Sequence, residues 1–96
     1  LGGKSRRRGT PAASRAELTR RLLALASLLR DLELLSVGAD VRWLANADLA
    51  DDLISMVPAF DRERCAHAFL AVGRALDAVD RNASPKVVAD WLACRL

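Results

Sequence analysis

Leucine residues recur at helical spacing in the first third of the chain. They are separated by three or four residues, at Leu18, Leu22, Leu25, Leu29 and Leu32. Because an α-helix turns once every 3.6 residues, these side chains share one face. Further apolar residues widen that face, at Leu23, Ala26, Leu28 and Leu35. The pattern predicts a long helix packed on more than one side, and Ser14 with Glu17 predicts a capping box at its start.

Helix-breaking residues punctuate the next stretch. Gly38 is expected to end the first helix, because glycine readily takes the left-handed conformation that closes a helix. Apolar residues in the following connector are expected to pin the chain to the core, namely Val41, Trp43 and Leu44. We expect Asn46 or Asp48 to cap a short helix that ends at Pro58. The apolar positions of this helix are Leu49, Leu53, Ile54 and Val57.

Two more helices are predicted in the last third of the chain. Asp61 is expected to cap the first of them, whose inward positions are Cys65, Phe69, Val72, Leu76 and Val79. Its outward positions are Arg62, Arg64, Arg74, Asp77 and Arg81. Ser84 can cap the second, and Pro85 fits the first position of a helix that continues to about Arg95. The inward positions expected there are Val87 or Val88, Trp91, Leu92 and Leu96.

No segment shows the sustained alternation or the hairpin turns of β-strands. The sequence therefore predicts an all-α protein, a small bundle of four to five helices with antiparallel neighbours. We expect residues 14–96 to form this helical domain and residues 1–13, rich in Gly, Ser and Arg, to be a flexible basic lead-in. The start at Leu1 suggests that the sequence is part of a longer chain.

Positive charge is concentrated at the start of the chain, although the net charge is only +3. Residues 1–21 hold seven basic side chains and one acid, Glu17. The candidates for contact with nucleic-acid phosphates are Lys4, Arg6, Arg7 and Arg8. No aromatic residue lies among them to stack on bases, so a solvated charged linker is the alternative.

Signatures of catalysis and of cofactor binding are missing from the sequence. It contains neither a phosphate-binding P-loop nor a dinucleotide-binding glycine motif. Asp48, Asp51 and Asp52 fit the start of a helix better than a metal site. Cys65 and Cys94 are expected to be buried small hydrophobic residues, and His67 has no nucleophile at a helical neighbour position. We therefore expect no catalytic residue, no metal, no cofactor and no small-molecule substrate.

No apolar run approaches the ~20 residues that span a bilayer, so we expect a soluble, cytoplasmic protein without membrane contact. Trp43 and Trp91 are expected to anchor the core. Trp91 has an alternative place in a partner interface, where tryptophan is enriched.

Three segments together resemble a known family. They are LLRDLELLSVGAD, NADLADDL and LDAVDRNASPKVVADWLACRL, and the resemblance covers residues 15–96. The chain is similar to the C-terminal collar domain of the delta-prime subunit of bacterial DNA polymerase III, a clamp-loader component. The matching positions are Arg30 with Asp31, Asn46 with Asp48, Asn82 with Pro85, and Arg95 with Leu96. Leu29 and Trp91 depart from the pattern, and the collar of the gamma/tau subunit is also a possible match.

The resemblance implies a function in DNA replication through protein–protein interaction. Family collars associate in a ring of five that holds the ATPase modules for loading the sliding clamp on DNA. It implies delta and gamma/tau subunits as partners, indirect DNA contact, and no enzyme activity for this chain by itself, although the parent complex is a DNA-directed DNA polymerase. The interface candidates are Arg62, Arg74, Asp77, Arg81, Asn82, Pro85, Trp91 and Arg95. The alternative is an independent helical nucleic-acid-binding domain that uses the basic lead-in.

Overall fold

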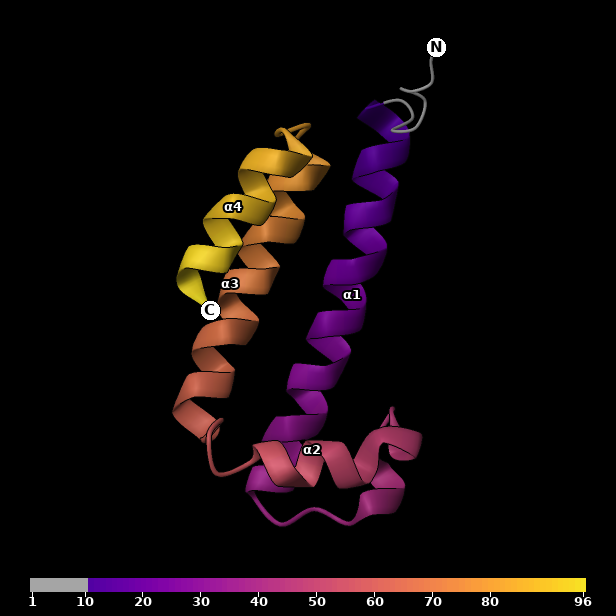
Figure 1. The fold of residues 1–96 in the computed structure, drawn as a ribbon, viewed down its shortest axis with the longest axis vertical. Coiled ribbons are helices and arrows are strands. Elements are labelled where there is room, and N and C mark those ends of the chain that lie inside the picture. The colour runs from indigo at the N-terminus through magenta and orange to yellow at the C-terminus, as the bar shows by residue number, and fades with distance from the viewer. Residues whose placement is uncertain (1–10) are drawn as a thin grey trace.

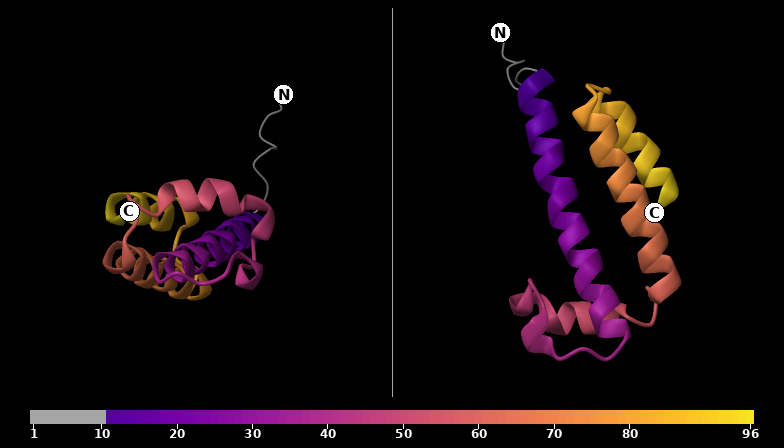
Figure 2. Two further views of the ribbon diagram at one scale, coloured as in Figure 1. Left: turned by 90° about the horizontal axis from the view of Figure 1, so that it is seen from below. Right: turned by 180° about the vertical axis from the view of Figure 1, so that it is seen from behind.

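The computed structural model describes residues 11–96, which form four α-helices and two short 3-10 turns without a strand. The elements are α1 (Pro11–Ser36), η2 (Val41–Trp43), η3 (Ala47–Leu49), α2 (Ala50–Met56), α3 (Arg62–Asp80) and α4 (Pro85–Arg95). α1 and α3 run antiparallel, α2 crosses one end, and α4 returns along α3 (Figure 1; Figure 2). The prediction of a small all-α bundle is confirmed. None of the described helices is both long and apolar enough to cross a membrane.

α1 begins at Pro11, three residues before the predicted start. Proline suits the first position of a helix, because its missing N–H would have no partner there. Residues 11–13 are therefore helical rather than part of the lead-in, and the rest of the predicted lead-in lies outside the described residues. Ser14 and Glu17 are inside the helix, so the predicted capping box is wrong.

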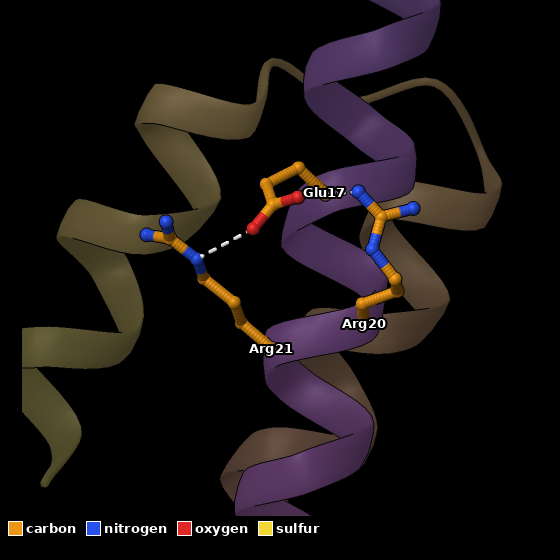
Figure 3. A network of polar contacts seen from close by, with 3 residues as sticks. All are labelled: Glu17, Arg20 and Arg21. Atoms are coloured by element: carbon orange, nitrogen blue, oxygen red, sulfur yellow. Dashed lines mark hydrogen bonds and ion pairs between the residues drawn. The ribbon is translucent and has the colours of Figure 1, made fainter.

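Glu17 pairs with two arginines of its own helix instead. It accepts a hydrogen bond from Arg20 and another, of 2.9 Å, from Nε of Arg21 (Figure 3). These bonds and charges lower the pKa of the Glu17 carboxyl below its ordinary value. All three side chains are exposed, so the network contributes little to stability.

The end of α1 is closed by glycine, as predicted. Gly38 has a φ of 82°, in the left-handed region. Its N–H donates to the Leu35 carbonyl at 3.0 Å, and the N–H of Ala39 donates to the Leu34 carbonyl at 3.0 Å. These two bonds are the Schellman pattern, which satisfies carbonyls at the helix end and turns the chain toward α2.

Small side chains form the buried face of α3, which packs between α1 and α4. The buried residues of α3 are Cys65, Ala68, Ala71, Val72, Ala75 and Val79. Facing them are buried residues of α1 and α4, namely Leu22, Leu29, Leu32, Val88 and Leu92. The predicted face of α3 is therefore partly wrong, because Phe69 is 43% exposed and alanines take the central positions.

Other predicted core positions also lie at the surface. Exposed side chains that were expected to point inward are Leu23, Val41, Trp43, Leu49, Ile54 and Leu96, whereas of the alternatives Val87 and Val88 it is Val88 that is buried. Trp43 is 69% exposed and therefore does not anchor the core. In the connector, Leu44 alone of the three predicted anchors is buried.

A buried carboxylate joins α1 to the connector that leads into α2. Asp31 is only 1% exposed, and its two oxygens accept from the backbone N–H groups of Ala45 at 3.0 Å and Asn46 at 2.8 Å. The Asn46 side-chain amide also donates to Asp31, at 2.8 Å, and to the Ser27 hydroxyl at 3.1 Å. Asn46 thus makes no side-chain cap to the short helix, and neither predicted cap is observed there. Three bonds compensate the burial of this charge.

The network makes Asp31 a strong determinant of stability. Asp31→Asn removes the charge and one acceptor oxygen. One backbone N–H of the connector, that of Ala45 or of Asn46, is then left without its acceptor. We expect the free energy of unfolding in urea to fall by about 2–3 kcal/mol. The exposed Asp51→Asn variant is the control and should change it by about 0.5 kcal/mol or less. Equal losses in the two variants would contradict this role of Asp31.

Candidate protein-interaction surface

The turn between α3 and α4 fixes how these two helices lie together. Asn82 takes a left-handed φ of 66°, which asparagine tolerates better than most residues. Its N–H donates to the Val79 carbonyl at 3.0 Å, and Ala83 donates to the Ala78 carbonyl at 2.9 Å. Ser84 then accepts from the Val87 N–H at 3.5 Å, with Pro85 at the first position of α4. The predicted cap at Ser84 and the predicted start of the last helix at Pro85 are confirmed.

Two adjoining hollows follow the seam between α3 and α4. The first, about 290 Å³, is lined by Arg74, Ala78, Ala83, Val87, Val88 and Trp91. The second, about 190 Å³, is lined by His67, Leu70, Ala71, Arg74, Trp91 and Arg95. Because Arg74 and Trp91 line both, the hollows form one continuous surface, which we term the α3–α4 groove.

Large apolar side chains are exposed along this groove. Leu70 of α3 and Val87 of α4 are each 64% exposed. Trp91 is half-buried and packs against the core with one part of its ring system. The Arg95 guanidinium lies 5.1 Å from the Trp91 ring centroid, a cation–π contact that holds the arginine beside the groove. Trp91 is therefore both a partial core residue and part of the surface.

The charges of the groove have one sign. None of the side chains that line its two hollows is acidic. Neither Arg74 nor Arg95 forms an ion pair with any residue in the range 11–96. Asp90 on α4 accepts a hydrogen bond from Lys86 at 3.3 Å. Two cations thus stand beside apolar surface without a carboxylate partner from the described part of the chain.

The predicted interface residues do not form one site. Arg74, Trp91 and Arg95 come together in the groove. Asp77 lines a separate hollow between α1 and α3, and Pro85 lines another between α1 and α4. The others are Arg62 in the first turn of α3, Arg81 at its C-terminal cap, and Asn82 in the turn, where its role is conformational.

Of the ten groove residues, sequence reasoning did not assign seven to an interface: His67, Leu70, Ala71, Ala78, Ala83, Val87 and Val88. A signal for Leu70 was present, because it lies four residues before Arg74 and outside the apolar stripe that was assigned to the core. Apolar side chains that adjoin one another at the surface, as Leu70 and Trp91 do in the second hollow, favour contact with another molecule.

The predicted nucleic-acid residues, Lys4, Arg6, Arg7 and Arg8, lie outside the described residues. Farther along α1, Arg20 and Arg21 are held by Glu17. This carboxylate neutralises part of the positive charge in this part of α1.

The two cysteines differ in environment. Cys65 is buried, and its thiol donates to the Phe60 carbonyl at 3.4 Å. Burial, with the charges of Glu33 and Asp61, raises the pKa of the Cys65 thiol. Cys94 is exposed, so the prediction that both cysteines are buried is wrong for this one.

The potential metal ligands of the described residues do not gather in one place. Within residues 11–96, no group of three or more His, Cys, Asp or Glu side chains could hold a metal ion. A cysteine–histidine pair would need both side chains in one place, but His67 lines a groove hollow that Cys94 does not line. The chemistry that the groove offers is recognition through apolar contact and positive charge.

Comparison of the chain with protein-family models, with curated proteins and with solved structures finds no match.

The cysteine environments predict selective labelling. A maleimide at neutral pH should modify Cys94 rapidly and Cys65 only on unfolding, because Cys65 is buried and its pKa is raised. Mass spectrometry should therefore find one adduct on the folded protein and two in concentrated urea. Cys94→Ser should leave the folded protein unmodified, whereas Cys65→Ser should retain the rapid adduct. Fast modification of both thiols in the folded protein would contradict the packing described for α3.

Proposed function

We propose that this chain is the C-terminal collar domain of a clamp-loader subunit of DNA polymerase III, of the delta-prime type. It is non-catalytic by itself and helps to hold the loader ring together for sliding-clamp loading in DNA replication. Its partners are the delta and gamma/tau subunits, and its connection to DNA is through the complex. The collar of the gamma/tau subunit is the related alternative.

The observation that carries the proposal is the contact between Asp31 and Asn46. These residues belong to two of the three segments on which the resemblance rests, and they are 15 positions apart. In the fold they make the buried hydrogen bonds that join α1 to the connector. The third segment contains Asn82 and Pro85, which shape the α3–α4 turn. A physical role for residues in all three segments supports reading them as the pattern of one fold family.

The surface chemistry supports an interaction module over an enzyme. The α3–α4 groove presents apolar side chains and unpaired arginines, which are typical of protein interfaces. A catalytic site would need a nucleophile, a base and oxyanion donors in one place. The two hollows of the groove are lined by no cysteine, serine or carboxylate that could act with His67.

In this proposal the domain acts as a rigid spacer and contact surface. The Asp31 network fixes α2 across the end of α1, and the Asn82 turn fixes α4 along α3. Exposed charges such as Arg62 and Asp77 contribute to orientation and to the choice of partner more than to affinity. The collar ring would then keep its shape while the ATPase modules move relative to it.

The rival function is an independent nucleic-acid-binding domain. The concentration of basic residues in positions 1–21 favours it, with Lys4, Arg6, Arg7 and Arg8 as phosphate contacts. The pairing of Glu17 with Arg20 and Arg21 weakens it. Association with loader subunits and direct binding to DNA can be measured separately.

The proposal predicts assembly with loader subunits. Residues 1–96 mixed with delta and gamma/tau subunits from the same organism should co-elute with them in gel filtration. The complex should persist when residues 1–10 are removed, since α1 begins at Pro11 and the helical domain stays whole. Deleting α4 is a poorer test, because Val88 and Leu92 are buried and their loss would destabilise the fold.

Separate elution of the chain and both subunits would contradict the collar proposal. A salt-dependent shift of duplex DNA that disappears on removal of residues 1–10 would favour the rival function instead. As a control, the chain without residues 1–10 is mixed with the loader subunits. This truncation leaves α1 to α4 intact, so a collar domain should still co-elute with them.

A further inference from the structure

We propose that the α3–α4 groove binds a helical segment of a partner protein that carries aliphatic side chains flanked by carboxylates. The aliphatic side chains enter the two hollows, and the carboxylates meet Arg74 and Arg95. This inference rests on the proposed function in one respect, that the chain is an interaction module, and it adds where and what the module binds.

The shape of the groove suits a helix. It follows the seam between two antiparallel helices, and a third helix can lay its side-chain ridge along such a seam. Leu70 of α3 lines one hollow and Val87 of α4 lines the other, each 64% exposed, and Trp91 lines both. A partner side chain in each hollow would remove apolar surface of Leu70 or Val87, and of Trp91, from water. Two hollows in a row suit a helix that repeats apolar side chains along one face.

The charge of the groove specifies acidic flanks. Arg74 lines both hollows, and Arg95 is positioned by its contact with the Trp91 ring. Neither arginine has a carboxylate partner within residues 11–96. Guanidinium groups bind carboxylates with paired hydrogen bonds, and these strengthen when a neighbouring helix excludes water. Basic flanks on the partner would instead be repelled by both arginines.

Nucleic acid fits this surface less well. The hollow next to the turn is lined, apart from Arg74 and Trp91, by alanine and valine side chains, which offer nothing to a phosphate. The Trp91 ring already has the Arg95 guanidinium 5.1 Å from its centroid, which obstructs stacking of a base. An apolar floor with two flanking cations is the complement of an amphipathic acidic helix.

The experiment uses a peptide library and a fluorescent reporter. Trp43 and Trp91 are the only tryptophans, so Trp43→Phe makes Trp91 a single reporter within the groove. The probes are helical 15-residue peptides with one face drawn from Leu, Ile and Ala and both flanks drawn from Glu, Gln and Lys. Peptides retained on the immobilised chain are sequenced, and each is titrated while Trp91 emission is recorded. A poly-dT oligonucleotide is titrated in parallel.

We expect retained peptides to carry Glu on the flanks and to shift Trp91 emission to shorter wavelength. The double variant Arg74→Glu with Arg95→Glu should weaken them by at least about tenfold and should select Lys-flanked peptides instead. The control reverses the same number of charges outside the groove, with Arg20→Glu and Arg30→Glu, and should bind as the parent does. Unchanged helicity by circular dichroism verifies that each variant is folded.

The proposal is overturned if no peptide is retained, if the retained flanks are neutral or basic, or if both double variants weaken binding equally. It is also overturned if poly-dT shifts Trp91 emission and displaces the peptides. Because no loader subunit is present, the result is independent of the co-elution test. Co-elution without peptide binding would contradict the groove proposal and leave the collar proposal standing with another contact surface. Peptide binding without co-elution would support the groove proposal and contradict the collar proposal.

Discussion

Close packing against the small-residue face of α3 is the constraint on which the remaining structure depends. Ala68, Ala71 and Ala75 provide a narrow surface, and Ala75 is 0% exposed. Because so little side chain stands between the backbones, α1 and α4 can both approach α3 closely. Leucines of α1 and the Val88 and Leu92 side chains of α4 then fill the remaining space. The α3 helix thus packs against both α1 and α4, and α1 also packs against α2 and α4.

This packing also explains the surface. With alanines in the interior, the larger side chains on the edges of α3 and α4 remain partly or fully exposed, among them Leu70 and Trp91. They become the walls of the α3–α4 groove, and the turn at Asn82 holds the walls in register. One feature of the sequence therefore produces both a stable bundle and an apolar site bordered by arginines. These are the properties on which the proposed interaction function rests.

Local signals in the sequence predicted the fold well, and non-local packing accounts for the failures. Gly38, Asp61 and Ser84 determine helix ends through bonds to near neighbours, so their roles were readable. Two adjacent stripes on α3 fit helical spacing, one containing Phe69 and one made largely of alanines. Hydrophobicity favours the stripe with Phe69 as the core face. The structure instead buries the alanine stripe, because small side chains let the neighbouring helices come close to α3. The spacing of residues in the sequence does not tell how close two helices lie. The Asp31–Asn46 contact joins positions 15 apart, so residue patterns alone did not reveal it. In the groove, Arg74, Trp91 and Arg95 were predicted, but their separation from Asp77 was not.

The most direct test of this account is the free energy of unfolding of Ala75→Leu, with Ala66→Leu on the exposed side of α3 as the control. If the small face sets the separation of the helices, the larger side chain at position 75 should cost about 2–3 kcal/mol in urea denaturation. The control should stay within about 0.5 kcal/mol of the parent protein. A protein that accepts leucine at position 75 without loss of stability would contradict the central role given to the alanine face.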